Sequence, residues 1–559
     1  MPLTPILKLT LKSGVTTSAN QSGQPAGYQR GRRATSRRAD QASQLAHLVR
    51  ERMSNIYDFI MVGAGSAGCV LAHRLSTDPG ARVLLLEAGP AATHPDIEVP
   101  LAFTRLQRSA LDWAYYTTPQ TELADRQVAW PRGRVLGGSS AINAMVYMRG
   151  DLRDYAAWGP GWCPDCVLPY FKRSQNQERL TLAGSPFHGV GGPLNVTDLR
   201  TVNPLSHAFL EAAASLGWPS NNDFNGLTQQ GAGLFQVTQL GGRRQSAAAA
   251  YLTPIRHRRN LQIVTGALVR RIRFDGDRAV GVEFSSGPDL LYAEAASEII
   301  LAAGAIESPK MLLLSGIGPE ADLKAQGIRL RALIPEVGQN LHDHPRVALP
   351  FRCQSPISLL NAFTPGALHE FHHSGAGPWS SNGAEAGAFV GNLQYHFLPL
   401  DLTNIGLEAT GHHGFTLAPT LLTPRSRGHL TLASADPAAA PLIDPAYLSH
   451  PDDLPALREG VRLSSELAAA APFAPYGVEV GRLPDPDALI RSRLDTCYHP
   501  AGTCAIGPVV DQELRVNGLR GLRVVDASVM PTLPRGNTHA PVVMIAERAA
   551  DFILGLAHP

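Results

Sequence analysis

Short apolar runs separated by glycine-rich turns form a regular pattern from residue 57 onward. Residues 57–62 (YDFIMV) and 82–87 (RVLLLE) are apolar runs of the length of a buried strand. Between them, residues 69–75 (CVLAHRL) place apolar side chains at helical spacing, directly after the turn 63–68 (GAGSAG). The pattern predicts a β-α-β unit in which the glycine-rich turn joins the first strand to the helix.

The glycines of this turn have the spacing of a dinucleotide-binding motif. Gly63 permits the tight turn, Gly65 lets the backbone approach a pyrophosphate, and Gly68 lets helix and strand pack closely. Glu87 ends the second strand 24 residues after Gly63, where a carboxylate accepts hydrogen bonds from ribose hydroxyls and repels a 2′-phosphate. These residues predict an adenine dinucleotide without that phosphate, and they do not by themselves separate NAD from FAD.

The length and charge of the chain limit its possible domain organisation and partners. With 559 residues it exceeds the roughly 250–300 residues of a single core, so at least two lobes are expected. The 49 basic and 47 acidic residues leave a net charge of +2, so we expect no nucleic acid partner. No apolar stretch reaches the ~18–20 residues that cross a bilayer. We expect a cytoplasmic protein, and peripheral attachment to a membrane stays open.

Residues 1–52 differ from the rest. Nine basic and two acidic residues give this arm a net charge of +7, which leaves −5 for the remainder. The arm is rich in Ser, Thr, Gln and Arg and lacks apolar periodicity, so it is expected to be disordered. We favour upstream sequence preceding a true start at Met53, with a targeting segment or a functional basic tail as the alternatives.

The cysteines and one group of histidines are candidates for metal or redox chemistry. Six cysteines are too few for a disulfide scaffold and favour a reducing compartment. Cys163 and Cys166 have the spacing of a redox or zinc pair, but no second pair accompanies them, so two loop thiols are expected. His369, His372 and His373 lie in a segment, 355–385, that we expect to be a polar loop without metal.

Three further blocks carry a family resemblance. They are residues 131–147 (PRGRVLGGSSAINAMVY), residues 304–319 (GAIESPKMLLLSGIGP) and the C-terminal block 498–541, which contains YHPAGTC, LRVVDASVMP and NTHAP. Weaker matches are 337–344 (VGQNLHDH) and 424–428 (PRSRG). Together they resemble the glucose-methanol-choline (GMC) family of flavin-dependent oxidoreductases. The resemblance runs from about residue 56 to the end.

The resemblance implies FAD as the cofactor. Family members with covalent FAD carry a histidine where this chain has Ile142, so non-covalent FAD is expected. The residues expected to bind it come from the glycine turn, the second strand and the three blocks. They are Gly63, Gly65, Ser66, Ala67, Gly68, Glu87, Ala88, Arg134, Gly138, Ser139, Asn143, Ala144, Met145, Val146, Val269, Ala303, Gly304, Asp526, Ala527, His539, Ala540 and Pro541.

The resemblance also implies the fold. We expect an α/β protein with a Rossmann-like FAD-binding domain from residues 53–160, 235–340 and 490–559. Residues 161–234 and 341–489 are expected to form a second, α+β substrate-binding domain built on an antiparallel sheet. Residues 428–432 (GHLTL) alternate as such a strand does.

The expected reaction is oxidation of an alcohol by proton abstraction and hydride transfer to flavin N5. His499 matches the family's catalytic base, and an imidazole pKa near ~6.5 suits that role. Asn537 matches the second catalytic position, where an amide orients the substrate oxygen. His539 stands where dehydrogenase-like relatives have asparagine, and we favour contact with the flavin over an acid-base or a space-filling role.

Substrate and acceptor are less sharply defined. Choline requires an aromatic or acidic cage, which the sequence does not locate, so neutral primary alcohols are expected. Electrons pass to a quinone or other carrier, with molecular oxygen as the alternative. A lyase or a decarboxylase on the same fold is the rival activity.

Overall fold

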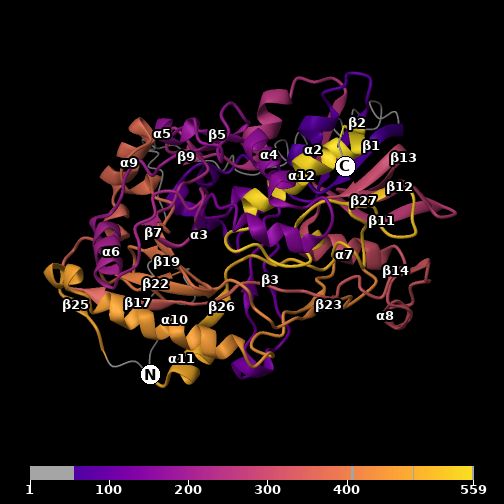
Figure 1. Cartoon of the computed structure of the whole chain (residues 1–559). Coiled ribbons are helices and arrows are strands. Elements are labelled where there is room, and N and C mark those ends of the chain that lie inside the picture. The colour runs from indigo at the N-terminus through magenta and orange to yellow at the C-terminus, as the bar shows by residue number, and fades with distance from the viewer. Residues whose placement is uncertain (1–55, 404–407, 482–483, 557–559) are drawn as a thin grey trace, which may run out of the picture. The chain divides into compact units, whose positions relative to one another are not determined.

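A seven-stranded sheet contains the predicted β-α-β unit (Figure 1). The computed structural model describes residues 56–403, 408–481 and 484–556. The sheet order is β10-β2-β1-β13-β12-β11, and β27 pairs with β13. Its strands are β1 (Ile56–Val62), β2 (Val83–Glu87), β10 (Leu261–Thr265), β11 (Ala267–Asp275), β12 (Arg278–Ser286), β13 (Asp289–Leu301) and β27 (Leu522–Val524).

The β-α-β prediction is confirmed. β1 and β2 pair in parallel, and α2 (Ser66–Leu75) connects them. Gly63 has φ of +99°, which favours glycine, and a Cβ on Gly68 would lie 1.9 Å from the carbonyl oxygen of Gly63. Helix and turn therefore meet backbone to backbone.

The second sheet has eight strands in the order β25-β17-β22-β19-β18-β7, with β16 joining β22 to β26. Its pairs are antiparallel, as expected. β26 lies within the range expected for the first lobe but pairs with β16. The strands are β7 (Gly231–Leu234), β16 (Pro345–Val347), β17 (Leu349–Cys353), β18 (Ala386–Val390), β19 (Leu393–Leu398), β22 (Gly414–Leu421), β25 (Val478–Glu479) and β26 (Leu494–Thr496).

Shorter elements complete the chain. Residues 428–432 contain β23 (His429–Thr431), which pairs antiparallel with β24 (Leu442–Asp444) as expected. The other two-stranded sheets pair β3 (Tyr115–Tyr116) with β4 (Ala129–Trp130), β5 (Gln175–Gln177) with β6 (Leu194–Val196), β8 (Gln239–Leu240) with β9 (Arg243–Arg244), β14 (Ile317–Gly318) with β15 (Ala332–Leu333), and β20 (Leu402–Thr403) with β21 (Glu408–Ala409). The remaining helices are α3 (Phe103–Leu106), α4 (Pro164–Ser174), α5 (Leu180–Ala183), α6 (Pro204–Ser215), α7 (Gly304–Leu314), α8 (Glu320–Ala325), α9 (Pro365–Ser374), α10 (Asp453–Ala468), α11 (Pro486–Arg493) and α12 (His539–Leu554).

A buried carboxylate ties three of these helices together. Glu547 of α12 is fully buried and accepts from Arg74 of α2 and Arg173 of α4, each at 2.8 Å. The hydroxyl of Tyr251 donates to the same carboxylate at 2.9 Å. The three donors satisfy the buried carboxylate, so α12 is fixed against the β-α-β unit.

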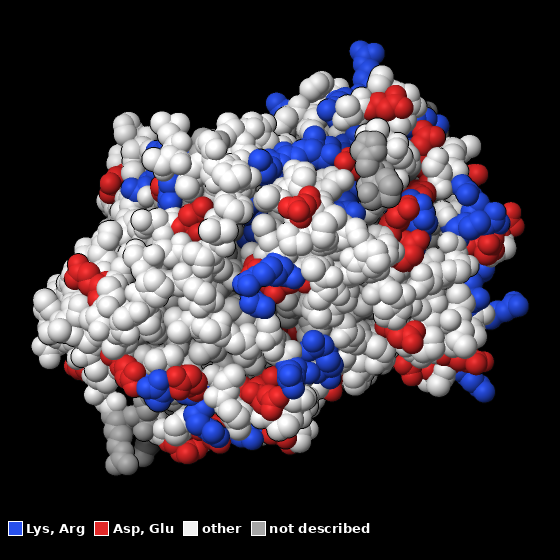
Figure 2. All heavy atoms as spheres, viewed as in Figure 1, with Lys and Arg blue, Asp and Glu red and all other residues white. Residues whose placement is uncertain are grey.

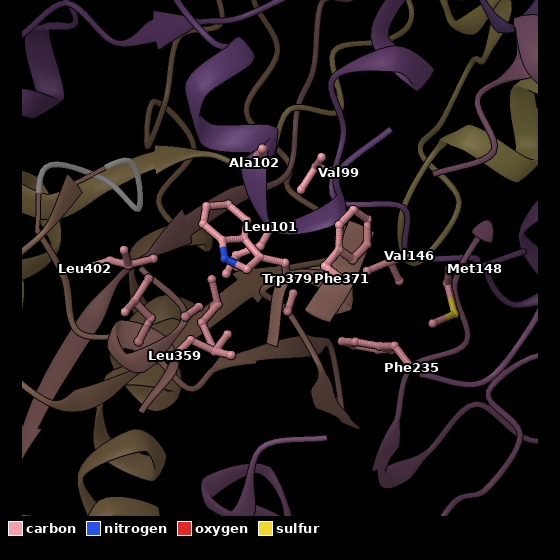
Figure 3. Packing of buried hydrophobic residues seen from close by; sticks show 14 of the residues in the cluster. Val99, Leu101, Ala102, Val146, Met148, Phe235, Leu359, Phe371, Trp379 and Leu402 are labelled. Carbon is pink, nitrogen blue, oxygen red and sulfur yellow. The ribbon is translucent and has the colours of Figure 1, made fainter. Parts of the chain in front are cut away.

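An apolar cluster packs the segment around residue 100 and residues 146–148 against the second lobe (Figure 3). Trp379, Phe371 and Leu101 are nearly fully buried in it. Burial of each such side chain contributes about 1.5–3 kcal/mol, so this cluster holds residue 146 firmly in place.

Two expectations of local structure were wrong. Within residues 355–385, α9 replaces the expected loop, because Thr364 caps the helix at Ala367 and Pro365 begins it. Cys163 and Cys166 form a disulfide instead of two loop thiols. Cys163 caps α4 and Cys166 lies in its first turn, which brings the two Cα atoms within 5.0 Å.

The described residues contain no cluster of three or more His, Cys, Asp or Glu side chains arranged to hold a metal ion. Within the same residues, no helix combines the length and apolar character needed to span a bilayer. On the face in Figure 2, basic and acidic side chains are interspersed, and wide areas carry neither, consistent with a charged fraction of 17%. The expectations for residues 1–52 fall outside the described residues.

Candidate active site

One cavity brings together most of the residues expected at the site. Its lining runs from the glycine turn and Glu87, past Ala303 and Asp526, to His499. Of the expected residues it contains His499, Asn537, Gly63, Gly65, Ser66, Ala67, Glu87, Ala88, Gly138, Ser139, Asn143, Ala144, Met145, Val146, Val269, Ala303, Gly304, Asp526, Ala527 and His539.

Four expected cofactor residues do not line this cavity. Gly68 lies one turn into α2, where it serves the close packing described above. The Arg134 guanidinium lies 4.8 Å from the ring centroid of Trp113, which does line the cavity. Ala540 and Pro541 are buried in the first turn of α12. These residues support the wall and do not form its surface.

Two helices begin at the cavity wall. α2 starts at Ser66 and α12 at His539, and neither N-cap residue, Gly65 or Thr538, makes a side-chain capping bond. Helix N-termini with uncapped N–H groups attract phosphate oxygens and other negative charge. The two starts meet, because Ser66 Oγ lies 3.0 Å from Nδ1 of His539. His539 Nε2 is buried without a hydrogen-bond partner among the described residues.

The space beside Gly65 fits a dinucleotide. Gly65 has φ of −74°, which any residue adopts, and a Cβ there would contact only Ala302 O, at 3.8 Å. The fold therefore does not itself require glycine at this position. A pyrophosphate in close contact with the chain at this point does require glycine. The uncapped helix starts and the available His539 Nε2 add hydrogen-bonding groups, so this wall fits FAD.

Both carboxylates of this end are held by protein donors. Glu87 accepts N–H bonds from Ala64 at 2.9 Å and Gly89 at 2.8 Å, and burial raises its pKa to about 7. Asp526 accepts from Gly304 N at 2.9 Å and Ser308 Oγ at 2.6 Å, and burial raises its pKa too. Asp526 thereby caps α7.

At the other end, His499 is buried and held by its backbone. Its N–H donates to Oδ1 of Asp343 at 2.8 Å, and Tyr447 donates to Oδ2 of the same carboxylate at 2.5 Å. The preceding Tyr498 has φ of +67°, which is rare for a residue with a side chain. This strained turn directs the imidazole into the cavity, where His499 forms part of the lining.

A second histidine fixes the tautomer of the first. His344 Nε2 lies 2.9 Å from the carbonyl oxygen of Leu422, which can only accept, so this nitrogen carries the hydrogen. Burial lowers the pKa of His344 to about 4, so the ring is neutral and its Nδ1 is an acceptor. His499 Nδ1 lies 2.9 Å from that atom and must therefore be the donor. Since burial and then His344 lower the pKa of His499 well below its usual value, its Nε2 is left unprotonated.

Asn537 is arranged to complement that lone pair. Its Nδ2 lies 3.3 Å from His499 Nε2, and its Oδ1 accepts from Gln394 Nε2 at 3.2 Å. The bond from Gln394 fixes which end of the amide faces the histidine. An unprotonated imidazole nitrogen and an amide donor thus share one point of the cavity, which suits removal of a proton from a hydroxyl.

The sequence did not reveal several lining residues of this end. His396 on β19 is 4% exposed, neither ring nitrogen has a well-formed hydrogen bond in the described part of the chain, and burial lowers its pKa to about 3. Arg346 on β16 also lines the cavity, as does Tyr498. Arg346 falls two residues after the weak 337–344 match, whereas His396 sits in an ordinary strand pattern that carries no signal.

Family models and similar known proteins both identify the same family for this chain. Models of the GMC oxidoreductase family match residues 57–346 and 424–546. An alcohol dehydrogenase [acceptor] of Pseudomonas putida is 43% identical over 530 residues, covering 89% of this chain and 96% of that protein. An oxygen-dependent choline dehydrogenase of Brucella anthropi is 41% identical, covering 89% and 95%.

Solved structures agree. Pyridoxine 4-oxidase from Mesorbium loti superposes with a TM-score of 0.82 at 34% identity, covering 90% of this chain and all of that one. A formate oxidase of Aspergillus oryzae RIB40, studied for its FAD modification, gives 0.84 at 26% identity, covering 90% and 98%. The family resemblance and the fold class predicted from the sequence are confirmed.

Proposed function

Because the chain belongs to the GMC oxidoreductase family, we propose that it oxidises a primary alcohol to the aldehyde with FAD as cofactor. The observation that carries this proposal is the position of the hydrogen on the neutral ring of His499, which is on Nδ1 and not on Nε2. Because Nδ1–H donates to His344, the unprotonated Nε2 of His499 faces the amide of Asn537 inside the cavity. A neutral imidazole in a buried site is a base ready to receive a hydroxyl proton.

The chain's own groups divide the work. His499 Nε2 takes the hydroxyl proton, and neutral His344 accepts the hydrogen bond from Nδ1–H of the resulting imidazolium. Asn537 donates to the substrate oxygen and orients it without competing for the proton. Burial of His499 and His344 keeps water away from the reacting nitrogen.

Bound FAD supplies the two-electron acceptor for the hydride that leaves the carbinol carbon. The residues that would hold it are the N-termini of α2 and α12, with Gly65 in close contact and His539 Nε2 as an available partner. Ile142 lines the cavity and has no nucleophilic atom, so we propose that FAD is not covalently attached. Denaturation of the holoprotein should then release all of its flavin into solution.

The test is anaerobic reduction of the purified holoprotein by aliphatic, aromatic and polyol alcohols. We expect the flavin absorbance to bleach with at least one primary alcohol, and a lyase or decarboxylase would leave it unchanged. Subsequent addition of a quinone or of oxygen identifies the electron acceptor. We propose a quinone or another carrier, in keeping with the acceptor dehydrogenase of Pseudomonas putida. Rapid reoxidation by oxygen alone would contradict that part.

A further inference from the structure

A buried guanidinium faces the substrate end of the cavity. Arg346 lines it together with His396, His499 and Asn537. Its side chain is 10% exposed, and Nη2 donates to the hydroxyl of Tyr498 at 2.8 Å. The position is fixed by the sheet, because Arg346 on β16 stands directly opposite Asp495 on β26.

The carboxylate that balances this cation lies away from the cavity. Asp495 Oδ2 is 3.2 Å from Nη2 of Arg346, and the Asp495 side chain is 3% exposed. Among the described residues, Arg346 is part of the cavity lining and Asp495 is not. Burial raises the pKa of Asp495 to about 6, and Arg346 acts against that rise. A bound substrate therefore meets the positive member of the pair first.

Three of the four aromatic rings that line the cavity in the described chain have a neighbour over one face. Arg346 itself covers the ring of Tyr498, with Cζ 4.8 Å from the centroid. Arg134 covers Trp113 at the same distance, and Tyr115 stacks on Trp113 at 5.8 Å. Quaternary ammonium groups are recognised by open aromatic faces or by carboxylates. Of the Phe, Tyr and Trp rings that line the cavity in the described chain, this leaves Phe103 alone without such a neighbour.

We propose that Arg346 is a specificity-determining residue that excludes choline and other cationic alcohols and reserves the site for neutral ones. The inference rests on the proposed function. It predicts that this chain does not accept choline, although relatives named for choline are 40–41% identical to it. Burial, His344, His396 and Arg132 lower the pKa of His499, and Arg346 adds to that shift.

The first test compares choline with 3,3-dimethylbutan-1-ol, which has the same shape with carbon in place of the charged nitrogen. The rate of anaerobic flavin reduction in the holoenzyme gives kcat/KM for each. Two positive charges about 7 Å apart at an effective dielectric constant of about 20 give an upper limit of about 50-fold on the preference for the neutral alcohol, because Asp495 compensates part of the Arg346 charge. Equal values, or a preference for choline, would overturn the proposal.

Variants of Arg346 and its partner Asp495 test whether the charge of Arg346 sets this preference. Arg346→Lys keeps the charge and should keep the preference within about threefold. Arg346→Gln combined with Asp495→Asn removes both charges without leaving a buried carboxylate unpaired, and should lower the preference at least tenfold. Arg352→Gln is the matched control, because Arg352 on the next strand is 55% exposed and lies outside the cavity lining. Its preference should equal that of the parent.

A binding measurement keeps this inference separate from the proposed function. Tetramethylammonium chloride is titrated into the oxidised holoenzyme at constant ionic strength, and the change in flavin absorbance is followed. We expect the double variant to bind this ion at least tenfold more tightly than the parent and Arg346→Lys. Equal affinities would contradict the inference whether or not any alcohol reduces the flavin. If no alcohol does, the proposed function fails, and this titration alone decides the role of Arg346.

Discussion

The two ends of the cavity are built in different ways. The cofactor end consists mainly of backbone N–H groups, small residues and helix starts, with the glycine turn 63–68 at its centre. The base end consists of side chains from separate segments, 343–346, 394–396, 497–499 and residue 537. Substitutions should therefore act differently. Added atoms at the cofactor end should weaken cofactor binding or destabilise the fold. Removal of atoms at the base end should abolish catalysis in a protein that still folds.

The largest expected effect is at the base end. His499→Ala should slow anaerobic flavin reduction by about 10²–10⁴, which is the usual contribution of a general base. The flavin content should remain close to that of the parent, because the imidazole contributes nothing to the cofactor end. Rapid-mixing absorbance measures the rate, and an unchanged rate would remove His499 from this role.

Two alanines distinguish fold from ligand at the cofactor end. Gly68→Ala places Cβ 1.9 Å from the carbonyl oxygen of Gly63, so the helix must shift and we expect a loss of about 3 kcal/mol or more in the free energy of unfolding. Gly65→Ala meets nothing closer than 3.8 Å and should leave the apoprotein as stable as the parent. It should, however, bind FAD at least about tenfold more weakly, since the pyrophosphate needs that space. Denaturant unfolding and flavin titration give the two quantities, and equal FAD affinity in Gly65→Ala would contradict our placement of the cofactor.

His344→Leu tests whether the tautomer matters. Without its acceptor the Nδ1–H of His499 is left buried and unpaired, and we expect flavin reduction to slow by about 10–100-fold. His344→Asn restores an acceptor oxygen and should recover part of the rate. A purely structural role would show as lowered thermal stability in both variants and no such recovery.

The pH dependence of flavin reduction in the parent tests the lowered pKa of His499. A base whose pKa is lowered stays neutral as the pH falls, so its rate should decline only well below pH ~6.5.

The smallest expected effect is the pH dependence of cofactor binding through Glu87. Its pKa is about 7 in the free protein, and ribose hydroxyls that donate to it favour the charged form and lower this pKa in the complex. Binding then releases a proton, so FAD affinity should fall as the pH drops below 7, by up to about tenfold per unit. Glu87→Gln should bind more weakly at pH 8 and show a flat profile. A flat profile in the parent would indicate that Glu87 does not meet the ribose.

Most residues that the sequence predicted for the cofactor end line one cavity, because the determinants there are local. Tight turn, helix start and terminal acid follow within about 25 residues, and each is tied to a backbone geometry that few residues satisfy. The four expected residues of this end that do not line the cavity are Gly68, Arg134, Ala540 and Pro541. They lie next to lining residues, because a linear motif marks a segment and not the direction of each side chain. The disulfide between Cys163 and Cys166 was missed because composition argued against it, while its formation depends on one helix start.

What the sequence by itself determined is the β-α-β unit, the family and the identity of the candidate base. The choice of proton-bearing nitrogen on His499 and the charge that faces the substrate were decided only by the tertiary structure. Both depend on contacts across 155 and 149 residues of chain, His344 to His499 and Arg346 to Asp495. Hydrogen-bond direction and buried charge are properties of groups brought together by sheet pairing, and no local pattern of side chains encodes that pairing.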